Sequence, residues 1–258
     1  MSKKIVLSLF ALLCGAVVLQ ARTVYITRHA QKQGDKITEL GREQAGLLGT
    51  YLAGKKFNGN IYVSPFFRTI QTGAAIAEKS DGRKVILEPA LQEIAFGKKH
   101  KVMGLKDIQD RLPGKVVPGK YFTDDWRIGG ENNDARLVRV SNMFDRLLKE
   151  DKGDILLVSH GGTVISMYKA MNRRRAEGVA PVKGIVWNCS LFIYEMDDND
   201  RVTSASYTTE YMPDEKVTSN FRAPKVPKPD DPRYEVRKGA ARGKAPNMDD
   251  PLKEVLKK

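Results

Sequence analysis

The sequence predicts an α/β fold of three layers, in which helices cover both faces of a mostly parallel central sheet. Short β-rich runs alternate with stretches of helical periodicity from Arg22 to about Pro213, an order typical of parallel sheets. The run Ile155–Val158 is entirely apolar, as expected for a buried strand. With 258 residues, of which 41% are hydrophobic, the chain is long enough for one substantial core and its appendages.

The first predicted strand and helix follow from residue type and spacing. Thr23–Thr27 is a short run of β-forming residues. Thr38 is a suitable N-cap for a helix over Glu39–Lys55, in which leucines recur near helical spacing. We therefore expect a strand followed by an amphipathic helix.

A second strand and helix are predicted directly afterwards. Ile61–Val63 is apolar and leads into Ser64 and Pro65, which we expect to be the N-cap and the first residue of a helix reaching about Glu78. Val85–Leu87 has the composition of a further short strand.

The remaining elements lie on either side of the buried strand. Lys98–Trp126 is rich in glycine, proline and charge, which predicts an irregular insert. Helical spacing of apolar residues predicts a helix over Asp134–Glu150, and a second is expected from Thr163 after the strand Ile155–Val158. Ser190–Met196 is expected to be the closing strand.

Residues 1–21 have the pattern of a secretory signal peptide. A basic start is followed by the uncharged stretch Ile5–Leu19, which is shorter than the roughly 20 residues that span a bilayer, and then by Ala21 at the expected cleavage point. We expect an exported protein, periplasmic or secreted. An uncleaved membrane anchor and a lipid-modified Cys14 are the alternatives. After cleavage at Ala21, Cys189 would be the one cysteine left, and a single cysteine excludes a disulfide-stapled scaffold.

Residues 214–258 are expected to form a disordered, basic, proline-rich tail. From Ser219 onward the chain has six of its 12 prolines, and 11 Lys or Arg against 6 Asp or Glu. Such a segment buries too little apolar surface to repay the entropy of ordering. Its charge suits weak contact with anionic surfaces, and the alternative is a solvated tail without a partner. We expect no nucleic-acid partner.

The predicted topology brings three distant segments to one rim of the sheet. Arg28 and His29 end the first strand, Arg68 lies in the first turn of the next helix, and His160 ends the buried strand. Ligands of such sheets bind outside the carboxyl ends of the strands. Two guanidinium groups there, with nearby helix N-termini, form a receptor suited to a phosphate group.

Five segments, in order, resemble the motifs of the histidine phosphatase superfamily, the phosphoglycerate mutase-like proteins. They are 27–30 (TRHA), 40–45 (LGREQA), 64–72 (SPFFRTIQT), 91–93 (LQE) followed by Gly97, and 158–162 (VSHGG). The resemblance covers residues 23–196 and implies a phosphoglycerate mutase-like fold and a histidine phosphatase domain over residues 22–213.

The resemblance also implies a role for each site residue. His29 would be the nucleophile that takes up the phosphoryl group, and Arg28, Arg68 and His160 would hold the phosphoryl oxygens together with it. Glu93 would be the general acid and then the base that activates water. No metal and no cofactor are expected.

Two further polar residues near these motifs are expected to be structural. Glu131 is predicted in the first turn of a helix, and His100 in a solvent-exposed loop.

The departures from the family pattern favour hydrolysis. Ala30 replaces a more frequent glycine, and Gln31 and Lys32 follow it in a chain that has a secretory start. The chain also lacks the length and cysteines of the large secreted acid phosphatases, so it resembles the smaller branch of the family. We therefore expect an exported phosphatase acting on phosphomonoesters of a small molecule or glycan. A phosphoglycerate mutase-like phosphotransferase and a catalytically weak phosphate- or phosphoglycan-binding protein are the alternatives. The substrate and the oligomeric state stay open.

Overall fold

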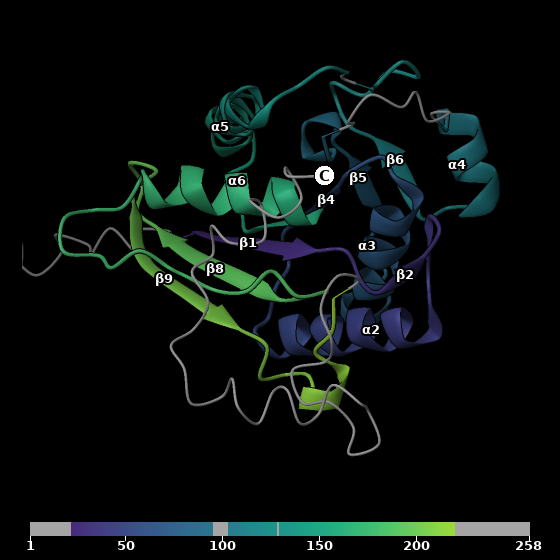
Figure 1. Cartoon of the computed structure of the whole chain (residues 1–258), viewed down its shortest axis with the longest axis horizontal. Helices are drawn as coiled ribbons and strands as arrows, with labels where there is room; N and C mark the ends of the chain where they lie inside the picture. The colour runs from purple at the N-terminus through teal and green to yellow at the C-terminus, as the bar shows by residue number, and fades with distance from the viewer. Residues whose placement is uncertain (1–21, 95–102, 128, 220–258) are drawn as a thin grey trace, which may run out of the picture.

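Figure 1 shows the fold in a computed structural model, which describes residues 22–94, 103–127 and 129–219. The expected signal peptide, His100 and residues 220–258 of the expected tail lie outside the described residues. No helix within the described ranges is long and apolar enough to cross a bilayer.

The described strands form one central sheet of seven and one small hairpin. The order in the sheet is β6-β5-β4-β7-β1-β8-β9. The first five of these are parallel, β8 is antiparallel to β1, and β9 is antiparallel to β8. The bounds are β1 Arg22–Arg28, β4 Asn60–Val63, β5 Val85–Leu87, β6 Val116–Pro118, β7 Ile155–Ser159, β8 Leu191–Met196 and β9 Val202–Thr208; the hairpin pairs β2 Lys32–Gln33 with β3 Lys36–Ile37.

Helices cover both faces of this sheet, which confirms the predicted three-layer α/β architecture (Figure 1). The helices α2 and α3 pack together on one face, and α5 and α6 pack on the other, while α4 lies beside the β6 edge. Their bounds are α2 Glu39–Gly54, α3 Phe67–Ser80, α4 Leu105–Arg111, α5 Asn133–Glu150 and α6 Gly161–Asn172, with 3-10 turns at Pro89–Leu91 and Asp214–Lys216.

The central strand β7 contributes to both cores, and this explains its apolar sequence. Ile155 and Leu157 pack with α5 and α6, whereas Leu156 and Val158 pack with α2 and α3. Alternate side chains of a strand point to opposite faces, so a strand covered on both sides needs apolar residues at every position.

The predicted helix starts were right for α2 and one residue late for α5. The Thr38 hydroxyl accepts the Gly41 N–H at 3.0 Å, as expected of an N-cap. Asn132 caps α5 through the Ala135 N–H.

The prediction for α3 was wrong at its start. The helix begins at Phe67, and its N-cap, Phe66, makes no side-chain capping bond. The Ser64 N–H instead donates to the Val158 carbonyl at 3.2 Å, so the backbone at Ser64 still follows the sheet ladder. Ser64 is therefore an extension of β4 and cannot cap a helix.

The predictions for three other segments need correction. The insert expected to be irregular contains α4 and β6, and β6 extends the sheet by pairing with β5. A three-residue strand has no readable periodicity, and Pro118 suits the edge because no further strand needs its missing N–H. The helix expected from Thr163 starts at Gly161, and β9 continues the sheet beyond the strand expected to close it.

Candidate active site

The parallel pairing of β1 with β7 brings the two predicted histidines together. Arg28 and Ser159 are register partners, and the His29 N–H donates to the Ser159 carbonyl at 2.8 Å. The rings of His29 and His160, one residue beyond each strand, therefore lie with their centroids 5.4 Å apart. Both side chains are buried. The sheet register alone explains how residues 131 positions apart share one site.

The contacts of His29 define its tautomer. Its Nδ1 lies 2.8 Å from the Ala30 carbonyl oxygen. Since a carbonyl only accepts hydrogen bonds, Nδ1 carries the proton and the neutral ring has its lone pair on Nε2. Burial, followed by the charges of Arg28 and Arg68, holds the pKa of His29 well below its usual value. His29 is thus a neutral imidazole with a nucleophilic Nε2.

His160 has the opposite tautomer. Its Nδ1 lies 2.9 Å from an Arg68 guanidinium nitrogen, which can only donate, so Nδ1 accepts. The proton is then on Nε2, which donates to the Ser64 hydroxyl oxygen at 2.9 Å. Burial, followed by the charge of Arg68, lowers the pKa of His160 as well. Sequence reasoning missed this role of Ser64, although its place directly after the strand next to β7 was a usable signal.

The two arginines are held from different sides of the pocket. Arg68, at the start of α3, has its guanidinium carbon 4.5 Å from the Phe66 ring centroid and donates to Asp35 at 2.5 Å. Its Nε is buried and makes no hydrogen bond to any described residue. Arg28 donates to the Val186 carbonyl and to the Ser219 hydroxyl, both at 3.1 Å.

The segment 214–219, which composition placed in the tail, packs against α2 and reaches Arg28. Val217 is fully buried, and the Thr218 carbonyl accepts the Asn188 N–H at 2.9 Å. Gln44 of α2 donates to the Thr218 hydroxyl at 2.9 Å. These contacts bring Ser219 to Arg28, so the ordered domain reaches at least this residue.

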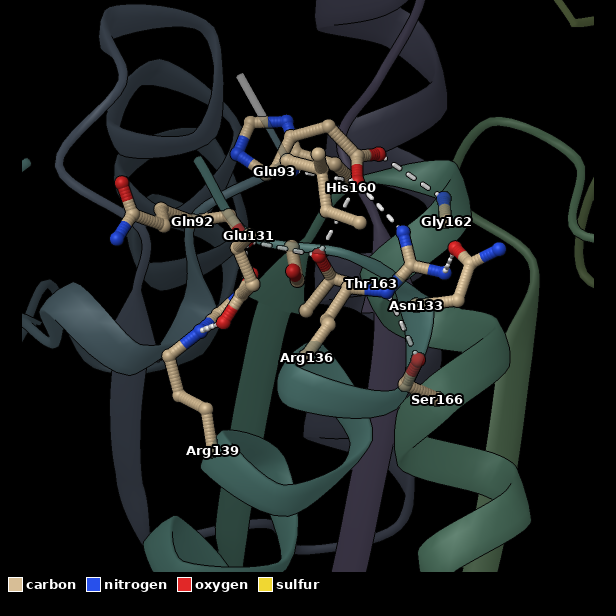
Figure 2. Close-up of polar contacts among 12 residues, drawn as sticks. Gln92, Glu93, Glu131, Asn133, Arg136, Arg139, His160, Gly162, Thr163 and Ser166 are labelled. Carbon is tan, nitrogen blue, oxygen red and sulfur yellow. Dashed lines mark hydrogen bonds and ion pairs between the residues drawn. The ribbon is translucent and has the colours of Figure 1, made fainter. Parts of the chain in front are cut away.

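Glu93 lies beside His160, at the N-terminus of α6 (Figure 2). Its Oε1 accepts hydrogen bonds from the Ile94 N–H at 3.0 Å and from Arg136 at 3.2 Å. Its Oε2 accepts the Gly162 N–H at 2.9 Å. The Thr163 hydroxyl also donates to Oε1, at 3.3 Å, so Oε2 accepts fewer of the hydrogen bonds that the described residues make to Glu93.

Arg136 is a site residue that sequence reasoning missed. Its guanidinium is buried on α5, where burial lowers its pKa, and it also donates to Ser166 at 2.9 Å and Asn133 at 3.0 Å (Figure 2). Arg136 lies four residues before Val140, on the buried face of the helix. An arginine inside an apolar helical stripe was the available signal, because a buried guanidinium needs an anionic partner.

Glu131 has a structural role, one residue before the α5 N-cap rather than in the first turn. It pairs with Arg139 at 2.6 Å, and the Arg139 guanidinium also donates to the carbonyls of Ala90 and Gln92. This pair fixes the loop that carries Glu93.

The structure therefore brings all five predicted site residues, Arg28, His29, Arg68, Glu93 and His160, to one rim of the sheet. An α/β protein with this set at the carboxyl ends of its strands is built as a phosphatase or phosphotransferase. The chain belongs to the histidine phosphatase superfamily (branch 1), whose family model matches residues 24–208.

A solved structure of a phosphatase shows the same fold. The ecdysone phosphate phosphatase from Bombix mori in complex with tungstate is 18% identical, with a TM-score of 0.53 over 74% of this chain and 93% of that one. A mycobacterial glucosyl-3-phosphoglycerate phosphatase is 21% identical, with a TM-score of 0.48 over 72% and 97% of the two chains. A search of curated proteins finds no significant match.

Proposed function

We propose that the protein is a phosphatase that hydrolyses phosphomonoesters through a phosphohistidine intermediate on His29. The observation that carries this proposal is the buried neutral imidazole of His29, whose lone pair lies on Nε2 in a pocket that also contains Arg28 and Arg68. A neutral ring can attack phosphorus, and fixed cations stabilise the charge on the transferring group.

In the first step, His29 Nε2 forms a bond to phosphorus while the ester P–O bond breaks. The leaving oxygen takes a proton from Glu93, which we place on Oε2. Arg28 and Arg68 hold the phosphoryl oxygens, and the Ala30 carbonyl holds the Nδ1 proton of the ring as it becomes positively charged.

In the second step, Glu93 acts as a base on water. The water oxygen forms a bond to phosphorus, the P–N bond to His29 breaks, and the proton passes to the carboxylate. Inorganic phosphate leaves, and His29 returns to its neutral form. One carboxyl group thus serves as acid and then as base, as two-step hydrolysis requires.

Hydrolysis rather than transfer is supported by the residues after the nucleophile, where Gln31 and Lys32 depart from the mutase pattern. We propose a phosphorylated small molecule or glycan as substrate. A phosphotransferase is the second candidate, because the same pocket could pass its phosphoryl group to an acceptor alcohol instead of water. Release of free phosphate, measured with and without sugar or glycerate acceptors, separates the two.

The test of the proposal is His29→Ala, assayed with p-nitrophenyl phosphate. We expect turnover to fall by at least about 10³-fold, because the variant loses the group that forms the covalent intermediate. Labelled substrate should leave an acid-labile phosphoryl group on the wild type and none on the variant. His100→Ala, the same change at a histidine expected to be exposed, is the control. Full activity in His29→Ala would contradict the assignment.

We propose in addition that the protein is exported by residues 1–21. Mass spectrometry of protein recovered outside the cytoplasm should find Arg22 as its first residue. An intact Met1 on soluble cytoplasmic protein would contradict export.

A further inference from the structure

The β2–β3 hairpin brings a carboxylate to Arg68, one of the proposed phosphate-binding residues. Asp35 lies in its turn, next to Gly34, whose φ of 60° gives the tight reversal. Its Oδ1 lies 2.5 Å from Arg68 Nη1, and its Oδ2 accepts the Phe67 N–H at the start of α3, at 3.2 Å. Asp35 thus bridges a guanidinium group and a helix N-terminus.

These two donors are of the kind that binds phosphate. A guanidinium group and the first N–H groups of a helix both favour anions, and they do so most strongly for a dianion. The same Arg68 also contacts His160 at 2.9 Å, so its guanidinium belongs to the histidine site. Asp35 and a bound phosphoryl group would therefore compete for the same hydrogen-bond donors.

The charged side chains that lower the pKa values of the paired histidines are cations. The pKa of His29 is lowered by Arg28, Arg68 and Lys32, and Arg139 adds to the effect on His160. Asp35 brings a negative charge to this cationic surrounding, and its side chain is 45% exposed, so it is not locked in a closed core. The hairpin is tied to α3 through the Ile37 N–H and Gln71 at 3.0 Å, which keeps the carboxylate at this place.

We propose that Asp35 weakens the binding of phosphate at the Arg68 donors and so hastens product release. This inference rests on the proposed function. A bound phosphate dianion must either displace the carboxylate from Arg68 or remain beside a like charge, and both cost affinity. The substrate phosphoryl group meets the same competition, so Asp35 raises KM together with the inhibition constant of phosphate.

The experiment compares Asp35→Asn with the wild type, using inorganic phosphate as the inhibitor. Asparagine has the same shape and keeps an oxygen for the Phe67 N–H but loses the charge. We expect the inhibition constant of phosphate to fall about 10-fold or more and KM to fall with it, and the gain to shrink at about 1 M NaCl. Asp35→Glu, which keeps the charge, should stay near the wild type. Asp198→Asn, in the turn between β8 and β9 at the other end of β1, is the control for net charge.

Two results would overturn the inference. Unchanged phosphate inhibition in a folded Asp35→Asn shows that the carboxylate does not compete, and weaker inhibition shows that it instead orients Arg68. If Asp35→Asn does not fold, Asp35→Ala is measured under the same criteria. If the wild type has no turnover, the proposed function fails, but calorimetric titration with phosphate still tests the role of Asp35. Tighter binding of phosphate to Asp35→Asn than to the wild type supports the inference. Equal or weaker binding to the variant, or no binding to either protein, overturns it.

Discussion

The pocket has two halves that handle charge differently. The cationic half consists of Arg28, His29, Arg68 and His160, two guanidinium groups and two neutral rings with the partly exposed Asp35 at their edge. The balanced half pairs Glu93 with the buried Arg136 and adds the N–H of Gly162 (Figure 2). One half has an excess of positive charge, and the other carries its own counter-ion.

This difference separates binding from proton transfer. A buried excess of positive charge costs free energy until a dianion offsets it, and it also keeps both imidazoles neutral. A paired carboxylate needs no ligand, so its position is the same before and after the phosphoryl group arrives. The comparison can be tested by changing one half at a time.

The largest effect is expected in the cationic half, for Arg68→Met. We expect kcat/KM for an aryl phosphate to fall about 10³-fold, since one preorganised donor to the transferring group is lost. The charge of Arg68 is also one cause of the low pKa values of His29 and His160, which lie well below 6.5. Its removal raises both values, so the acid limb of the pH profile should move to higher pH.

The measurement is kcat/KM from about pH 4 to pH 8 for the wild type and the variant. The substrate's own second ionisation, with a pKa near 6, is the same in both, so the difference between the profiles belongs to the protein. Arg201→Met, at an exposed arginine in the turn between β8 and β9, should leave rate and profile unchanged. An acid limb that does not move in Arg68→Met would contradict the statement that the positive charge of Arg68 helps to keep the rings of His29 and His160 neutral.

A smaller and more selective effect is expected in the balanced half, for Glu93→Gln. Loss of a general acid should lower kcat about 10²-fold for an alkyl phosphate, whose leaving group needs a proton. For p-nitrophenyl phosphate, whose leaving group departs as a stable anion, the first step should slow far less. Rates for both substrates, with single-turnover release of nitrophenol, give the comparison. Equal losses for both would mean that Glu93 acts only through water or only through structure.

Much of this arrangement could be predicted from sequence because it follows from strand order. Arg28 ends β1, and His29 and His160 directly follow β1 and β7. Because parallel strands end at one rim, the meeting of these residues needs no knowledge of side-chain packing. The five ordered motifs then connected Arg68 and Glu93 with them.

The residues that sequence reasoning missed depend on contacts that local patterns do not contain. Asp35 reaches Arg68 only because the β2–β3 hairpin, with its two-residue turn, lies against the start of α3. Arg136 reaches Glu93 only because α5 packs on α6. Ser64 was assigned to a helix cap because serine before proline is typical of one, but the strand ladder continued through it. In each case tertiary contact decided the role of a polar residue whose local signal was ambiguous.

The finest test of the two halves is one substitution at two adjacent glycines in the first turn of α6. A methyl group at Gly161 would lie 3.7 Å from Arg28 Nε, an ordinary contact, whereas one at Gly162 would overlap Arg136 Nη1 and lie 2.8 Å from Glu93 Oε1. Both positions are helical, where alanine is favoured over glycine by about 0.5–1 kcal/mol. Gly161→Ala should therefore keep its activity and gain slightly in the free energy of unfolding.

Gly162→Ala should lose activity, about 10-fold in kcat for an alkyl phosphate, because its methyl group pushes the Glu93–Arg136 pair apart and a displacement of about 1 Å at a catalytic group is costly. It should leave phosphate inhibition near the wild-type value, since the cationic half is untouched. The measurements are the free energy of unfolding in denaturant, kcat for an alkyl phosphate and the inhibition constant of phosphate, determined for both variants. Equal changes in activity and in phosphate inhibition for Gly161→Ala and Gly162→Ala would mean that the two halves are not separate, because a methyl group at either position would then act on both halves through the backbone of α6.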